Sequence, residues 1–217
     1  MSAQPAYRLH SEPIAETDEF AEVLEGLRRQ NKRIEPRFFY DERGSELFTE
    51  ITRQPEYYPT RTEMSLLQYL AADLRNLAGE GCTLIEYGSG SSEKIRILLE
   101  SLKPAIYAPL DISKDYLVQA ADNIGREYPW LDVQAICVDY TKSFDLPAQF
   151  GAPSGEQATG KKLGFFPGSS IGNFSPEAAL AFLQLIRQQL GNGGALLIGV
   201  DLKKSTEVLN QAYNDAA

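Results

Sequence analysis

The chain has 217 residues, of which 43% are hydrophobic and 24% are charged, values that exclude a disordered or fibrous chain and are typical of a globular protein with a sizeable core. Its 21 basic residues against 30 acidic ones give a formal net charge of -9, which disfavours a protein that tracks nucleic-acid phosphates. No run reaches the ~18 apolar residues of a membrane span, and the first residues hold no apolar signal core, so we expect a cytoplasmic protein that binds neither membrane nor nucleic acid.

The first eighty residues favour helices. Asp18 and Glu19 suit the first turn of a helix, where the helix dipole favours acidic side chains. The apolar residues of this helix recur at i, i+3, i+4 and i+7 and predict one buried face: Phe20, Val23, Leu24 and Leu27. A second, short helix is expected over residues 45–51.

A third helix is expected to open at Thr60, because Thr60 and Glu63 have the spacing of a capping box. Before it, two prolines bracket Tyr57 and Tyr58. Residues 54–61 are therefore predicted to form an ordered, non-helical connection that presents aromatic rings.

Short apolar runs alternate with helical periodicity from residue 83 onward. Five strands are expected, over residues 83–87, 105–110, 134–138, 163–166 and 195–200. This alternation of strands and helices predicts an α/β fold with a parallel, doubly wound sheet.

Helices are expected in most gaps between these strands. Ser175 and Pro176 have the residue types of an N-cap and a first helical position. Residues 151–162 hold no large apolar side chain and are predicted to form an exposed loop. The first helix of this half is predicted to have a core face that consists of Ile95, Leu98, Leu99 and Leu102.

Histidine and cysteine are scarce, which limits the catalytic groups, metal sites and disulfides that the chain can form. The one histidine, His10, lies in a polar stretch, so we expect no histidine general base, no Ser-His-Asp triad and no metal site. The two cysteines, Cys82 and Cys137, each stand beside an apolar run. We interpret them as buried thiols in a reducing cytosol, with a disulfide as the alternative.

Acidic residues stand at four of the five strand ends, where ligands bind in an open parallel sheet. These residues are Glu86, Asp111, Asp139 and Asp201.

The first strand runs into the turn Glu86-Tyr87-Gly88-Ser89-Gly90, whose glycines let the backbone approach a ligand closely. A dinucleotide fingerprint would need a third glycine where Glu93 stands, so a nicotinamide enzyme is disfavoured. The acid-x-Gly-x-Gly turn, with Asp111 placed 21 residues past Gly90, instead resembles Rossmann-like methyltransferases that bind S-adenosylmethionine. For the glycines alone, an ordinary tight turn is the alternative.

Three longer blocks carry a more particular resemblance. They are FFYDERGSELFTEITRQPEYYPTRTE from residue 38, IEYGSGSSEKIRILL from residue 85 and FFPGSSIGNFSPEAALAFL from residue 165. Together they resemble the histidine-specific N-methyltransferases, which trimethylate the α-amino group of histidine to hercynine for ergothioneine biosynthesis. The likeness runs in order from about Lys32 to Tyr213.

The resemblance implies S-adenosylmethionine as cofactor, a small amino acid as substrate and a role for particular residues. Residues 1–80 would be an N-terminal helical segment that contributes to the substrate site, and residues 81–217 a Rossmann-like cofactor-binding domain. The implied cofactor positions are Gly88, Lys94, Asp111, Asp139 and Tyr140. The implied substrate positions are Tyr40, Tyr57, Gly168, Asn173 and Tyr213, of which Tyr40 and Asn173 would also be catalytic.

Each of these residues has an ordinary structural alternative. Without the resemblance, we would interpret Lys94 as a solvated helix lysine and Asn173 as a turn residue. The tyrosines would be core residues with their hydroxyls at the surface. The chemistry nevertheless suits them, because methyl transfer to a neutral amine needs alignment and desolvation rather than a histidine base.

The family is longer than this sequence, which ends soon after the helix that follows the fifth expected strand. The family's final strand pair and an acidic residue that recognises the imidazole have no counterpart here, and an open sheet edge predicts self-association or a partner. Two alternatives stay open: the same chemistry on another amine such as a tryptophan derivative, and a cofactor-binding module that is inactive without its C-terminal part or a partner.

Overall fold

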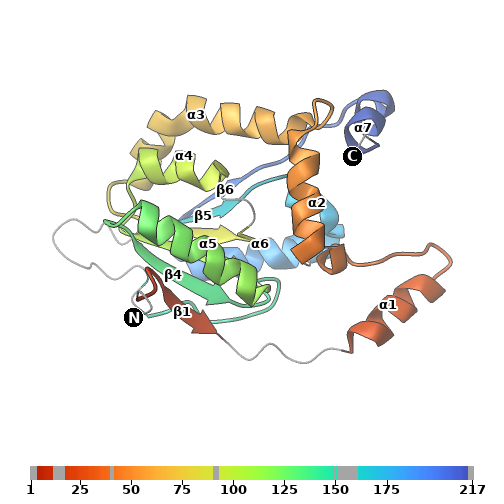
Figure 1. Ribbon diagram of the computed structural model, residues 1–217, viewed down its shortest axis with the longest axis horizontal. Helices are drawn as coiled ribbons and strands as arrows, with labels where there is room; N and C mark the ends of the chain where they lie inside the picture. Colours follow the sequence, from red (N-terminus) through yellow and green to blue (C-terminus); the bar gives the residue numbers. More distant parts are fainter. Residues whose placement is uncertain are drawn as a thin grey trace.

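The computed structural model describes residues 4–11, 18–39, 42–89, 93–148, 150 and 161–214. Within them, six parallel strands form one sheet in the order β1-β4-β3-β2-β5-β6 (Figure 1). The strands are β1 (Arg8–Ser11), β2 (Thr83–Tyr87), β3 (Ile106–Asp111), β4 (Asp132–Cys137), β5 (Lys162–Phe166) and β6 (Ala195–Ile198). This confirms the predicted α/β fold with a parallel sheet and all five predicted strands.

Helices cover both faces of the sheet. Their bounds are α1 (Glu19–Arg28), α2 (Glu42–Arg53), α3 (Tyr58–Ala78), α4 (Glu93–Leu102), α5 (Lys114–Glu127), α6 (Pro176–Leu190) and α7 (Thr206–Tyr213), with 3-10 turns η1 (Pro36–Phe39) and η2 (Ser170–Asn173). Successive strand residues point to opposite faces, so Leu84 joins the core under α3, α4 and α5, whereas Ile85 joins the core under α6. The sheet is therefore doubly wound.

Two helices follow their predicted patterns closely. In α6, Pro176 occupies the first turn and the Ser175 side chain accepts a hydrogen bond from the Ala178 amide. The four predicted core residues of α4, namely Ile95, Leu98, Leu99 and Leu102, are all 0% exposed.

Strand β1 was not predicted. It pairs with β4, and His10 Nε2 lies 3.0 Å from Gln134 Oε1 across that pairing. The segment before it crosses α5 at Gly125, where a Cβ would lie 2.0 Å from the Ala6 carbonyl oxygen. Four mostly exposed residues carry too weak a pattern to reveal a strand whose pairing partner is distant in the sequence.

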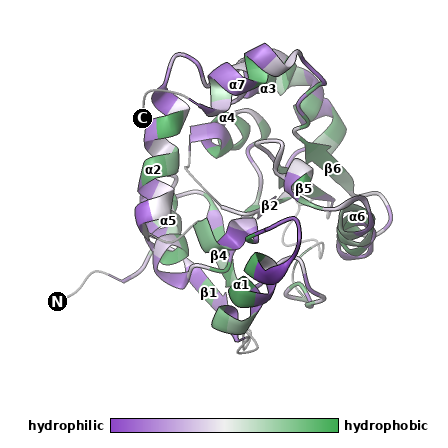
Figure 2. Cartoon of the chain, turned by 90° about the vertical axis from the view of Figure 1, so that its right-hand side faces the viewer, coloured by the Kyte–Doolittle hydropathy of each residue, from purple (hydrophilic) through white to green (hydrophobic). Residues whose placement is uncertain are grey.

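Helix α1 has its predicted position but not its predicted buried face. Asp18 caps it by accepting from the Ala21 amide. Phe20 is 76% exposed and Leu27 is 39% exposed, and Gly26 is the one buried residue of the helix. Figure 1 shows α1 standing apart from the sheet, and Figure 2 shows hydrophobic and hydrophilic residues side by side along it. Periodicity predicts an apolar face, but it does not supply the surface that covers it.

The predicted start of the third helix was wrong. Helix α3 begins at Tyr58, since Pro59 fits the first helical turn, and residues 58–61 are helical rather than an irregular connection. Thr60 and Glu63 thus lie inside the helix and form no capping box. The Glu63 carboxylate bonds to residues far along the chain instead.

The remaining predictions concern the cysteines, which the structure describes, and several residues that it does not describe. Cys82 and Cys137 are buried free thiols, as predicted. Most of the predicted loop over residues 151–162, together with Gly90 and Tyr40, lies outside the described residues. Among the described helices, none combines the length and apolar character needed to cross a membrane.

Candidate active site

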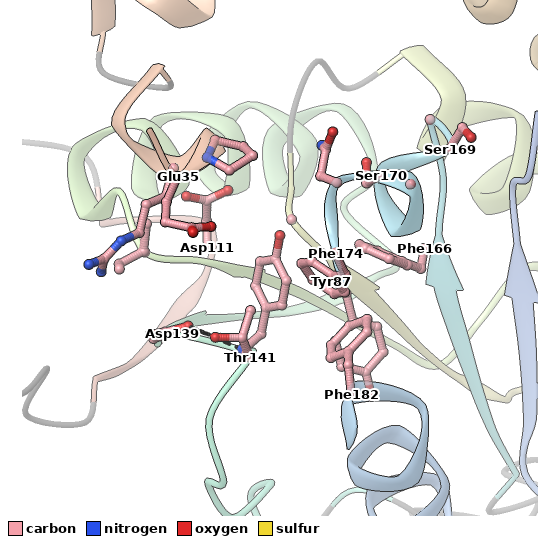
Figure 3. A pocket seen from close by; sticks show the side chains of 18 of the residues that line it. Glu35, Tyr87, Asp111, Asp139, Thr141, Phe166, Ser169, Ser170, Phe174 and Phe182 are labelled. Carbon is pink, nitrogen blue, oxygen red and sulfur yellow. Dashed lines mark hydrogen bonds between the residues drawn. The ribbon is translucent and has the colours of Figure 1, made fainter. Parts of the chain in front are cut away.

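A cavity of about 1260 Å³ opens at the carboxyl ends of the parallel strands. The chain leaves β2 for β3 on one side and later returns to β5 on the other side, so the strand order reverses at β2. Figure 3 shows Asp111 and Asp139 on one side of this cavity and the rings of Phe166, Phe174 and Phe182 on the other. The topology therefore gathers residues from four strand ends around one space.

The turn after β2 brings backbone into the cavity. Gly88 has a φ of +79°, and a Cβ there would lie 3.0 Å from the Tyr140 hydroxyl oxygen. The amides of Gly88 and Ser89 both donate to the Leu110 carbonyl at 3.0 Å, which ties this turn to the end of β3. Glycine is needed here for both the left-handed conformation and the close approach.

Asp111 ends β3 and lines the cavity. Its Oδ1 accepts from the Ser113 amide at 2.8 Å. Burial raises the pKa of the Asp111 carboxyl to about 6, although hydrogen bonds from the backbone amides of Ser113 and Ile112 oppose that rise. A carboxylate of this kind can accept hydrogen bonds from the hydroxyls of a bound ligand.

Asp139 follows β4 and is held differently. Its Oδ1 accepts from the Thr141 amide at 3.1 Å and from the Thr141 hydroxyl at 2.6 Å, and Lys142 Nζ lies 3.1 Å from Oδ2. Burial acts to raise the pKa of Asp139, but these hydrogen bonds outweigh it and lower that pKa below its ordinary value. Asp139 therefore keeps its negative charge more readily than Asp111.

Aromatic rings form one wall of the cavity. The Phe182 ring on α6 lies 4.9 Å from the Phe166 ring, 5.2 Å from the Phe174 ring and 5.9 Å from the Tyr140 ring, measured between centroids. Such rings exclude water from the adjoining space.

A second aromatic group consists of one residue from α2, one from α7 and Tyr57, which caps the start of α3. The buried Tyr57 ring meets the Phe48 ring of α2 edge-on at 6.1 Å and the Tyr213 ring of α7 edge-on at 5.8 Å. All three residues line the cavity. Ring faces and hydroxyls of this kind can surround a cationic amine.

The loop after β5 borders the same region. Gly168 has a φ of +77°, and the next residue, Ser169, is also left-handed with a φ of +57°. Farther along, the Asn173 carbonyl accepts a hydrogen bond from Arg33 at 3.2 Å. The loop is thereby tied to the segment that follows α1.

Lys94 forms an ion pair that the sequence did not predict: its Nζ lies 2.5 Å from Glu63 Oε2. Tyr40 lies outside the described residues. The other nine predicted site residues all line the one cavity, although their individual roles stay predictions: Tyr57, Gly88, Lys94, Asp111, Asp139, Tyr140, Gly168, Asn173 and Tyr213.

Sequence reasoning missed the part of the cavity that the N-terminal segment lines. The missed residues are Glu22, Arg29, Arg33, Glu35 and Arg37. Their charges look like those of an ordinary solvated surface, so the local sequence carries no signal of their position.

Glu86 lies beneath the glycine turn and is 4% exposed. Its Oε2 accepts a hydrogen bond of 2.5 Å from the buried Tyr107 hydroxyl. Burial raises the pKa of Glu86 to about 7, against the opposing effects of the Tyr107 hydrogen bond and the Lys94 charge. The folded protein therefore holds a proton on Glu86 at pH values where the unfolded chain has lost it.

This gives a testable pH dependence. Because the folded-state pKa of Glu86 is raised, the contribution of Glu86 to the free energy of unfolding falls as pH rises from about 4.5 to about 7. We expect Glu86→Gln to gain stability relative to the parent chain between pH 5 and pH 8, by roughly 1–3 kcal/mol. Urea unfolding at both pH values measures this difference, with Glu93→Gln at an exposed site as the control. A difference that does not change with pH would contradict the assignment.

Comparison with known proteins identifies relatives over most of the chain. Residues 19–217 match the family described as histidine-specific, SAM-dependent methyltransferase. The histidine N-alpha-methyltransferase of Mycolicibacterium smegmatis is 40% identical over 200 residues, which cover 90% of this chain and 59% of that protein. Ergothioneine biosynthesis protein 1 of Neurospora crassa is 33% identical over 180 residues, covering 81% of this chain and 20% of that protein.

More distant relatives have names that mention other substrates. The 4-dimethylallyltryptophan N-methyltransferase of Claviceps purpurea is 27% identical over 202 residues, covering 88% of this chain and 58% of that protein. The solved structure of mitomycin 7-O-methyltransferase superposes with a TM-score of 0.50 at 11% identity, covers 89% of this chain and 54% of that chain, and shows the fold alone. The family match and the Mycolicibacterium relative show that this chain belongs to the histidine-specific, S-adenosylmethionine-dependent methyltransferases.

Proposed function

We propose that this chain transfers methyl groups from S-adenosylmethionine to the α-amino group of an amino acid, with L-histidine as substrate and Nα-trimethylhistidine, or hercynine, as product. One observation carries the proposal: the nine described residues that match the family's cofactor and substrate positions line a single cavity. Family membership supports the cofactor and the reaction. The chain spans 59% of the length of its Mycolicibacterium relative, so the activity of this length of chain is part of the proposal.

The acidic side of the cavity fits the cofactor's nucleoside. Asp111 would accept hydrogen bonds from the two ribose hydroxyls, and Asp139 and Tyr140 would help to hold the cofactor. Gly88 leaves room for a ligand next to the backbone because it has no side chain. Lys94, which lines the same cavity, faces an anionic part of the cofactor.

The aromatic side fits the amine. When bound, S-adenosylmethionine supplies an electrophilic methyl carbon on its sulfonium. Tyr57 and Tyr213 hold the amine with its lone pair toward that carbon, and their ring faces tolerate the growing methylammonium charge. Asn173 and Gly168 bind the polar groups of the amino acid, and Tyr40 completes the set of catalytic and substrate residues.

We also propose a cytoplasmic location. The two buried free thiols, Cys82 and Cys137, suit a reducing compartment.

The first test is product analysis. The chain is incubated with S-adenosylmethionine, the twenty amino acids and 4-dimethylallyltryptophan, and mass spectrometry detects the gain of one, two or three methyl groups. We expect trimethylated histidine. Methylation of another amine would keep the chemistry but replace the substrate, whereas cofactor binding without any product would favour a binding module that needs a further segment or partner.

The second test separates the two sides of the cavity. We expect Asp111→Ala to weaken S-adenosylhomocysteine binding by roughly 10- to 100-fold, as for a lost hydrogen bond to a charged group. Asn173→Ala should leave that affinity within about twofold and raise the KM for the amine. Calorimetry and steady-state kinetics measure the two effects. An equal loss of cofactor affinity in both variants would assign Asn173 to fold support.

The third test concerns the sheet edge. Strand β6 is an edge of the described sheet, and an unpaired edge offers backbone groups to a second chain. We propose self-association or a partner at this edge. Light scattering at working concentration should give a mass above that of one chain, and a Pro substitution at Ile198 should lower it. The Gly199 N–H bonds to the Phe166 carbonyl of β5, so the N–H of the preceding residue, Ile198, points to the open edge of the sheet. A monomeric mass for the parent chain would count against self-association.

A further inference from the structure

Glu63 joins four parts of the molecule although it does not line the cavity. It lies in the first two turns of α3, and its side chain is 15% exposed. Its Oε2 lies 2.5 Å from Lys94 Nζ, on a lysine side chain that is 16% exposed. Its Oε1 and Oε2 lie 2.9 and 3.0 Å from the Gly168 amide nitrogen. One carboxylate thus connects α3 with α4 and with the loop after β5.

The fourth part is the end of β6. A Cβ at Gly199 would lie 1.9 Å from Glu63 Oε1 and 3.2 Å from the Gly168 nitrogen. Gly199 therefore leaves the space that the Glu63 carboxylate occupies. This is independent of the hydrogen bonds and shows that the surrounding backbone is shaped around Glu63.

The loop that Glu63 holds is conformationally demanding. Gly168 and Ser169 are both left-handed, and a non-glycine residue adopts that conformation only when its surroundings fix it. Ser169 Oγ accepts from the Asp201 amide at 3.0 Å, and Glu63 accepts from the Gly168 amide. Two hydrogen bonds from outside the loop therefore define its shape.

Both partners of Glu63 line the cavity. In the proposed function, Lys94 contacts the cofactor and Gly168 contacts the amine substrate. We propose that Glu63 is a positioning residue that fixes the Lys94 ammonium and the Gly168 turn relative to each other. This inference rests on the proposed function for its consequence: an in-line methyl transfer is sensitive to shifts of about 1 Å between the two reactants.

The first measurement needs no ligand. Amide hydrogen exchange at Gly168 is followed by NMR in the full chain, in Glu63→Ala and in Asp73→Ala, which removes an exposed acid from the same helix. Because Gly168 is otherwise exposed, losing its acceptor should speed exchange by about tenfold or more in Glu63→Ala. Asp73→Ala should match the parent chain. Unchanged exchange in Glu63→Ala would overturn the inference.

A second variant tests the position of the Glu63 carboxylate without removing it. Gly199→Ala keeps the carboxylate but pushes it out of its place, so it should also speed exchange at Gly168. Slow exchange at Gly168 in a folded Gly199→Ala chain would count against the inference.

The second measurement asks whether Glu63 acts through Lys94. The affinity for S-adenosylhomocysteine is measured by calorimetry for Glu63→Gln in the parent chain and in a Lys94→Met background. We expect a change of about fivefold or more in the parent background and less than about twofold in Lys94→Met, because residues that act as a pair are not additive. Equal changes in both backgrounds would assign Glu63 to fold support alone and overturn its positioning role. Failure of every variant and the parent chain to bind would count against the proposed function, while the exchange result still decides the geometry.

Discussion

The reversal of strand order at β2 is the constraint on which the site depends. Parallel strands present their carboxyl ends at one edge, and the chain passes to β3 on one side of β2 and to β5 on the other. The turn after β2 therefore separates the acidic side, which ends β3 and β4, from the aromatic side, which adjoins β5 and α6. The reaction that we propose would bring the cofactor and the amine together at this turn, between the two sides.

Charge is distributed unequally around that turn. Burial raises the pKa values of Glu86 and Asp111, whereas hydrogen bonds from Thr141 and Lys142 lower that of Asp139. Below about pH 6, the protons on Glu86 and Asp111 therefore reduce the negative charge around the turn. Asp139 is fixed by its own neighbours, and Asp111 has the environment in which added hydrogen bonds from a ligand would favour the charged form.

Residues 1–80 reach the sheet through apolar packing and also through polar links. Leu67 and Ala78 of α3 belong to the hydrophobic core, and β1 pairs with β4. Glu63 reaches Lys94 and Gly168, Arg33 reaches the Asn173 carbonyl, and α1 buries little apolar surface. Gly168 and Asn173 belong to the segment that follows β5, Lys94 belongs to α4, and all three residues line the cavity. The N-terminal segment and these cavity residues therefore hold each other in place.

Local sequence determined the elements whose signals are local. The period of Ile95, Leu98, Leu99 and Leu102 gave the core face of α4, Ser175 with Pro176 gave the start of α6, and the strand-end acids with the glycine turn indicated the cofactor edge. The family blocks indicated residues that the fold gathers in one cavity. Only the tertiary structure decided that β1 joins the sheet, that Phe20 and Leu27 of α1 stay exposed and that Glu63 bonds across the fold. Its partners Lys94 and Gly168 lie 31 and 105 residues away in the chain, and the packing of whole elements sets such contacts rather than local spacing.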